Sequence, residues 1–106
     1  MTKAEVIAAI SEKTNINKEH VSETVEAFFK VVQESLEEGE NIYVRGFGSF
    51  INKKRAKKIA RDIANNAPMP IDAHYIPSFK PAKVFVEKIK SSEMLKKRLQ
   101  EEEQGK

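Results

Sequence analysis

The fold is decided by the stretch of residues 46–61, which reads GFGSFINKKRAKKIAR. Two glycines flank a phenylalanine, and six of the ten residues from 52 to 61 are lysine or arginine. Glycine permits the positive φ and the close backbone approach of a tight turn, and the β-prone residues 41–44 lie just before it. The stretch therefore predicts a hairpin, at residues 45–51, that passes directly into a strongly basic strand.

A second extended run follows, because Pro68 and Pro70 exclude a helix there. The two prolines are two residues apart, so their missing amide groups face the same side of a strand, which an edge strand tolerates. Residues 62–67 would form the turn between the runs, with Asn65 or Asn66 accepting a positive φ. Residues 52–76 are thus predicted to form a long two-stranded ribbon with almost nothing to bury.

Residues 1–44 predict two helices. The pair Thr2 and Glu5 matches a capping box, and the helix that it begins should end near Asn15. Asn17 is a suitable cap for the second helix, and Gly39 is well placed as the left-handed residue after its end. The apolar residues of this second helix recur at helical spacing, and the stripe that they form is interpreted as core.

After the ribbon, Pro77 and Pro81 are expected to bracket a rigid connector to a third helix that begins near Ala82. Residues 77–90 are therefore assigned to a C-terminal helix with its connector. Residues 91–106 are expected to be an extension, helical at first and frayed at its end.

Charge is unevenly distributed along the 106 residues. The net charge is −5 over residues 1–44, +8 over residues 45–90 and zero over residues 91–106. A basic segment of this size predicts a polyanionic partner. Cysteine is absent, which excludes disulfides and thiolate metal sites. No apolar run approaches the roughly 20 residues of a membrane span and no secretory segment is visible, so we expect a cytoplasmic protein without a membrane partner.

The ribbon is a physical problem for a monomer, because an isolated two-stranded ribbon is marginally stable in water. About eighty residues remain to build a core, which is barely sufficient for one. Phe28 and Phe29 make the apolar stripe wider than one short helix would cover. We therefore expect an obligate, two-fold symmetric homodimer, with pairing to a related chain left open.

The residues now resemble a known family. Gly46-Phe47-Gly48-Ser49-Phe50, Arg55-Ala56, Arg61, Ile76-Pro77-Ser78-Phe79 and Lys83 are similar to the HU and integration host factor family, over residues 1–90. The resemblance implies an α+β fold: an intertwined homodimer with a helical body, a small antiparallel sheet and two extended β-ribbon arms. It also implies a non-enzymatic nucleoid protein, without cofactor, that binds duplex DNA with low sequence specificity through the minor groove and bends it.

The resemblance also assigns DNA-binding residues. On the arm these are Lys53, Arg55, Lys58 and Arg61; on the body they are Lys3, Lys80 and Lys83; at the saddle they are Gly46 and Ser49; and at the arm tip they are Ile63 and Asn65. The tip departs from the family, which usually has Arg-Asn-Pro where this chain has Arg61-Asp62-Ile63. Ile63 thus takes the place of the wedging proline, and Asp62 adds a negative charge that should weaken contact with phosphate.

Other functions remain as alternatives. A binder of single-stranded DNA or RNA would place aromatic side chains among the basic residues, and residues 53–61 contain none. A DNA-associated structural protein would polymerise beyond the dimer. An enzyme is the weakest alternative, because no Ser/His/Asp set, paired carboxylates or metal-ligand spacing is present, and no small-molecule substrate or metal site is predicted.

Overall fold

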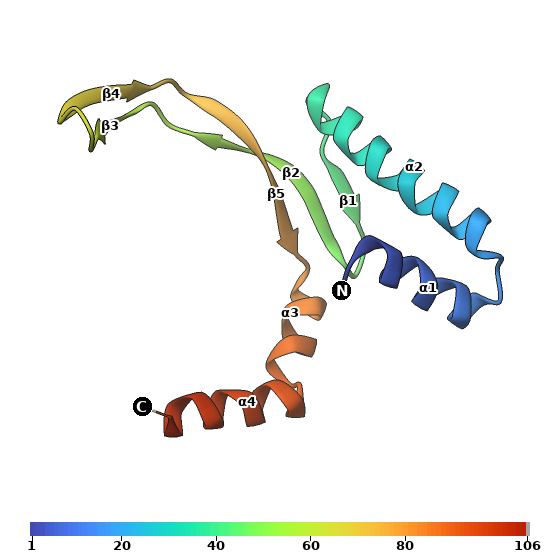
Figure 1. Ribbon diagram of the computed structural model, residues 1–106. Coiled ribbons are helices and arrows are strands. Elements are labelled where there is room, and N and C mark those ends of the chain that lie inside the picture. The colour runs from blue at the N-terminus through green and yellow to red at the C-terminus, as the bar shows by residue number, and fades with distance from the viewer. Residues whose placement is uncertain (106) are drawn as a thin grey trace.

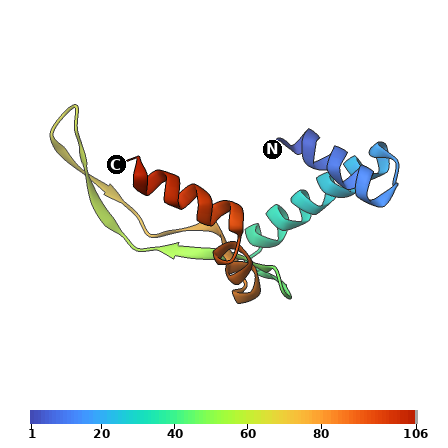
Figure 2. The same cartoon turned by 90° about the horizontal axis from the view of Figure 1, so that it is seen from below.

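A computed structural model of the chain describes residues 1–105 (Figure 1). The elements follow in the order α1 (Lys3–Thr14), α2 (Lys18–Glu37), β1 (Ile42–Val44), β2 (Gly48–Arg55), β3 (Lys58–Asp62), β4 (Ala67–Ile71), β5 (His74–Pro81), α3 (Lys83–Lys90) and α4 (Glu93–Gln104). Helices α1 and α2 lie on one side of the strands, and the long ribbon and α4 extend away from them in both views (Figures 1 and 2). The predicted α+β class is confirmed.

The helix ends form where the sequence predicts them. The Thr2 hydroxyl accepts a hydrogen bond from the Glu5 amide at 3.2 Å, and Asn17 Oδ1 accepts one from the Glu19 amide at 2.7 Å. These bonds satisfy amides that have no partner inside the first turn. Gly39 has a φ of +86° just after the end of α2, as expected for a left-handed residue at this position.

Strands β1, β2 and β5 form an antiparallel sheet in that order. The turn between β1 and β2 closes with a 3.0 Å hydrogen bond from the Phe47 amide to the Val44 carbonyl. Gly48 then comes so close to β5 that a Cβ there would lie 2.6 Å from the Lys80 carbonyl oxygen. Only glycine allows this approach, so Gly48 fixes how the hairpin sits against β5.

The arm continues from this sheet without a break at residue 52, since β2 pairs with β5 from Gly48↔Pro81 to Arg55↔His74. Residues 56–57 and 72–73 then leave the strands at the same level, and β3 pairs with β4 from Lys58↔Ile71 to Asp62↔Ala67. Asn66 has a φ of +50° in the terminal turn, as predicted. The ribbon expected for residues 52–76 is therefore present as two consecutive paired segments.

The expected connector at residues 77–81 is wrong, because these residues belong to β5. Pro77 lies opposite Asn52 and Pro81 opposite Gly48, four positions apart and therefore in the same type of pair. The Asn52 amide donates to Asn41 Oδ1 on the other side of β2, so this pair does not exchange ladder hydrogen bonds. Prolines fit an edge strand whose amide positions face outward, and the C-terminal helix α3 begins only at Lys83.

The extension is helical, as expected, and the fraying of its end stays a prediction. After a break at Ser91, Ser92 accepts a hydrogen bond from the Leu95 amide, and α4 continues to Gln104. The Gly105 amide donates to the Glu101 carbonyl at 3.0 Å. Residues 93–104 consist almost entirely of strong helix formers, which explains the continuous helix. Lys106 lies outside the described residues.

The single chain buries very little. Its buried hydrophobic residues are Ile7 and Val21, and a cluster of phenylalanines with ring centroids 5.1–6.3 Å apart joins α2, the sheet and α3. The radius of gyration is 19.7 Å, whereas a compact chain of this length has one of about 13 Å. Among residues 1–105, no helix has the length and apolar character that crossing a membrane requires.

Candidate nucleic-acid interface

The predicted basic residues of the arm are all exposed, but they do not share one face. Lys53 and Arg55 lie two residues apart on β2 and therefore point to the same face, opposite Ile76 and His74 of β5. Lys58 and Arg61 lie three residues apart on β3 and point to opposite faces. The arm thus presents positive charge on both faces, as a strand inserted between two phosphate backbones would require.

The family resemblance did not assign two further cations of the arm, Lys54 and Lys57. Both are exposed and lie within the basic run of residues 52–61. Lys54 pairs with Tyr75 on β5 and points to the face opposite that of Lys53 and Arg55. The high content of lysine and arginine in residues 52–61 was the signal that could have identified them, because they do not lie at the positions that the family resemblance assigned.

The saddle residues are brought together at one end of the sheet. Ser49 lies directly opposite Lys80 in the β2–β5 pair. The Ala82 amide donates to the Phe47 carbonyl at 2.9 Å, which holds the hairpin turn and its exposed Gly46 beside the start of α3, where Lys83 is the first residue. Gly46, Ser49, Lys80 and Lys83 therefore lie at the same end of the sheet, and the arm extends from the other end of the β2–β5 pair.

Lys3 is separate from this group and is held by an acidic partner. Its ammonium nitrogen lies 2.8 Å from Glu26 Oε1 on α2, and both side chains are more than half exposed. The hydrogen bond from Lys3, followed by the charge of Lys3, holds the pKa of Glu26 below its ordinary value. Lys3 is therefore already paired with a carboxylate, whereas within residues 1–105 no ion pair involves a cation of the arm.

The arm tip carries a highly exposed apolar side chain. Ile63 is 95% exposed, more than any other large hydrophobic residue of the described chain. Asn65 and Arg61 both make contacts inside the tip: the Asn65 side-chain amide donates to Asp62 Oδ2 at 3.1 Å, and Arg61 Nη1 donates to Asn66 Oδ1 at 3.2 Å. The tip thus presents an apolar side chain on a turn built from polar contacts.

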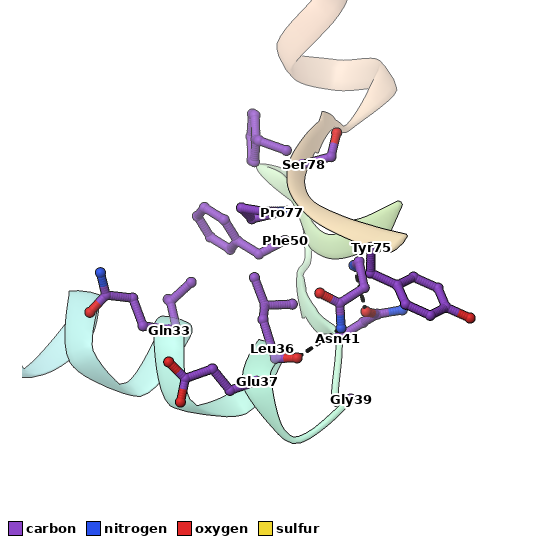
Figure 3. A pocket seen from close by; sticks show the side chains of 12 residues that line it. Gln33, Leu36, Glu37, Gly39, Asn41, Phe50, Tyr75, Pro77 and Ser78 are labelled. Carbon is purple, nitrogen blue, oxygen red and sulfur yellow. Dashed lines mark hydrogen bonds between the residues drawn. The ribbon is translucent and has the colours of Figure 1, made fainter. Parts of the chain in front are cut away.

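The base of the arm is fixed to α2 beside an open apolar hollow of about 1000 Å³ (Figure 3). Asn52 Nδ2 donates to the Leu36 carbonyl at 2.9 Å, and the Asn52 backbone amide donates to Asn41 Oδ1 at 3.1 Å. Leu36, Phe50 and Phe79 contribute apolar walls to the hollow. Within residues 1–105, no three histidine or carboxylate side chains gather where they could hold a metal ion.

Comparison with known proteins gives consistent matches. A family model described as Bacterial DNA-binding protein matches residues 1–90. Integration host factor subunit alpha of Anaeromyxobacter sp. (strain Fw109-5) is 33% identical over 95 residues, which cover 90% of this chain and 96% of that protein. The SPbeta prophage-derived DNA-binding protein HU 2 of Bacillus subtilis (strain 168) is 34% identical over 91 residues, which cover 86% of this chain and 99% of that protein.

Solved structures show the same similarity. The Anabaena HU–DNA cocrystal structure matches with a TM-score of 0.82 at 29% identity and covers 87% of this chain and 100% of that one. HU from Thermotoga maritima matches with a TM-score of 0.59 at 26% identity, covering 84% of this chain and 98% of that one. The family match ends at residue 90, so α4 lies beyond it.

Proposed function

Since the chain belongs to the HU and integration host factor family of bacterial DNA-binding architectural proteins, we propose that two copies of it clasp and bend duplex DNA. The family consists of DNA-binding proteins and not of enzymes. The observation that carries the proposal is the extended ribbon of residues 52–76, which is basic on both faces and buries almost nothing. We place the protein in the cytoplasm, on the nucleoid.

The apolar surface of the single chain supports a dimer. Its accessible area is 9416 Å², whereas a compact monomer of 12.1 kDa exposes about 6,000 Å². The arm accounts for part of the excess, and exposed phenylalanines of the body for another part: Phe28, Phe29 and Phe47 are 46%, 46% and 44% exposed. Interfaces of obligate homodimers bury roughly 2,000–5,000 Å² in total, which this excess can supply. We propose a homodimer; a related chain could take the partner's place.

The cations of the arm and saddle supply the affinity. Lysine and arginine neutralise phosphates and release condensed counterions, so binding weakens steeply with salt. The proposed DNA-binding residues are Lys3, Gly46, Ser49, Lys53, Arg55, Lys58, Arg61, Ile63, Asn65, Lys80 and Lys83. With about 6–10 phosphate contacts, affinity should fall by roughly 10³–10⁵ between 50 and 200 mM salt. Lys3 must exchange Glu26 for phosphate, so we expect it to contribute less than an arm cation.

The tip supplies the bend. A two-stranded arm enters the minor groove, which distinguishes little beyond A·T from G·C, so sequence specificity is low. Ile63 then inserts between base pairs, and this unstacking costs a few kcal/mol that new contacts with the body offset. DNA that is nicked, flexible or already bent requires less of this work and should bind more tightly.

The test is a gel-shift series with linear, nicked and cruciform duplexes and with a single strand of the same sequence, at 50 and 200 mM salt. Bending is measured by energy transfer between dyes at the duplex ends. We expect tighter binding to nicked and cruciform DNA, a steep loss with salt and a bend that decreases in Ile63→Ala. Equal affinity for single-stranded and duplex DNA, or an unchanged transfer efficiency on binding, would refute the proposed function.

A further inference from the structure

The turn at the arm tip is organised by a carboxylate that the proposed DNA contacts do not use. Asp62 is the last residue of β3 and pairs with Ala67, the first residue of β4. Its Oδ1 accepts a hydrogen bond from the Ala64 amide at 3.0 Å, and its Oδ2 accepts one from Asn65 Nδ2 at 3.1 Å. Both oxygens of one side chain thus bind the two residues that follow Ile63.

These contacts matter because, besides the hydrogen bond from Arg61 Nη1 to Asn66 Oδ1, little else holds the turn. Residues 63–66 are exposed, the neighbouring strands bury almost nothing, and the tip lies at the far end of the ribbon from the helices (Figure 1). An aspartate that accepts from an amide two residues ahead forms a local turn that replaces missing backbone contacts. Within residues 1–105 the Asp62 carboxylate makes no ion pair, so its oxygens serve the turn alone.

We propose that Asp62 is a positioning residue, whose carboxylate holds the turn of residues 63–66 so that Ile63 stands exposed at the end of the arm, ready to enter a base step. This rests on the proposed bending function. The sign of its charge opposes DNA binding, because a carboxylate beside phosphate is repelled. Asp62 therefore has two opposite effects: its oxygens order the tip, and its charge weakens affinity. Affinity alone cannot separate them, whereas the order of the tip and the bend angle can.

Two variants separate the effects. Asp62→Ala removes the charge and both hydrogen bonds. Asp62→Asn removes the charge but keeps one oxygen that can accept from the Ala64 amide, although its NH₂ group cannot accept from Asn65. Asp72→Ala is the matched control, since Asp72 is an exposed carboxylate of the same arm outside the tip, and only its backbone carbonyl contacts His74.

The experiment measures hydrogen exchange of the Ala64 amide in the free dimer by NMR, and bending of a nicked duplex by energy transfer. In Asp62→Ala we expect Ala64 exchange to rise about fivefold, since its amide no longer has an acceptor, and the bend to decrease. Asp62→Asn should keep most of the protection and a native bend, with affinity at least as high as that of the native chain. Asp72→Ala should raise affinity and leave exchange and bend unchanged.

Three results would overturn the proposal: unchanged Ala64 exchange in Asp62→Ala, faster exchange with a native bend, or an Asp62→Asn variant that behaves like Asp62→Ala. Failure of the proposed function looks different, because the native protein itself would then fail to bend DNA. If the native protein bends DNA, and Ile63→Ala abolishes the bend while all Asp62 variants keep it, the bending function stands and the role of Asp62 is refuted.

Discussion

Replacing Gly48 by alanine tests how the hairpin is seated on the sheet. A Cβ at this position would lie 2.6 Å from the Lys80 carbonyl oxygen and 2.7 Å from the ring of Phe79. The carbonyl belongs to the backbone of β5, which is held by the pairing of Ser49 with Lys80, and the ring belongs to the phenylalanine cluster. Neither neighbour can retreat by the ångström or so required without breaking the interactions that hold the saddle together.

The cost follows from this geometry. Forcing an extra carbon into a packed site costs about 1–3 kcal/mol, and a backbone conformation that favours glycine adds about 1 kcal/mol. We expect Gly48→Ala to lose about 3 kcal/mol per chain, which lowers the unfolding midpoint by roughly 12–24 °C for a domain of this size. The assay is thermal unfolding followed by circular dichroism, with native and variant proteins at the same concentration because the proposed dimer would couple unfolding to dissociation.

Gly46→Ala is the matched control. Gly46 has a φ of +79°, yet no atom lies within 4 Å of the position that a Cβ would take. Only backbone strain of about 1 kcal/mol is then expected, with a midpoint shift of roughly 4–8 °C. If Gly48→Ala unfolds within a degree or two of Gly46→Ala, the close approach of the hairpin to β5 is not present in solution and the reasoning fails.

Three further outcomes are expected. Changing Arg55, Lys58 and Arg61 together to glutamine should reduce the slope of log affinity against log salt by about 0.9 for each phosphate that the variant no longer neutralises. The same change at Lys13, Lys18 and Lys30 should leave the slope unaltered. Equal slopes for the two variants would contradict the role of the arm. Diluting the protein should lower its unfolding midpoint, and a midpoint independent of concentration would exclude an obligate dimer. Because Lys3 lowers the pKa of Glu26, their pair stabilises the fold above the unfolded-state pKa of that carboxyl and stops doing so as pH falls through its lowered value. The small difference in midpoint between the native chain and Glu26→Gln should therefore be present at neutral pH and vanish in acid; a difference that persists in acid would contradict it.

Features set by one residue and its nearest neighbours were predictable from the sequence. The caps at Thr2 and Asn17 depend on a side-chain oxygen within two or three residues of an unpaired amide. Gly39 was predicted to have a positive φ, and so was one residue of the pair Asn65 and Asn66, because few residues accept it; the structure has it at Asn66. The basic arm was predicted because its many charged residues have to stay exposed and its prolines exclude a helix, and an extended two-stranded ribbon satisfies both conditions.

Features that depend on pairing between residues far apart in the sequence were not predictable from the sequence. In the sequence, Pro77 and Pro81 suggest a connector. In the structure, they pair with Asn52 and Gly48 at positions where β5 does not need to donate an amide to the ladder. How the faces of Lys58 and Arg61 on β3 relate to the face of Arg55 on β2 depends on the break at residues 56–57, which no local signal marks. The bonds from Asp62 to the residues after Ile63 require the turn itself, so the sequence alone indicates only the charge of Asp62.

The distribution of apolar surface connects the fold to the proposed function. The body exposes phenylalanines that a second copy would cover in the proposed dimer. The arm also exposes apolar side chains, namely Ile59, Ile63, Met69 and Tyr75, and its ladder is interrupted at residues 56–57 and 72–73. Few interactions between its strands therefore resist a change in its shape. In the proposed dimer, the shared body would fix the spacing of the two arms, and each arm would adapt to the groove that it enters. A tip ordered by its own side chains would then direct Ile63 toward a base step, because an arm with an interrupted ladder gives that side chain little support.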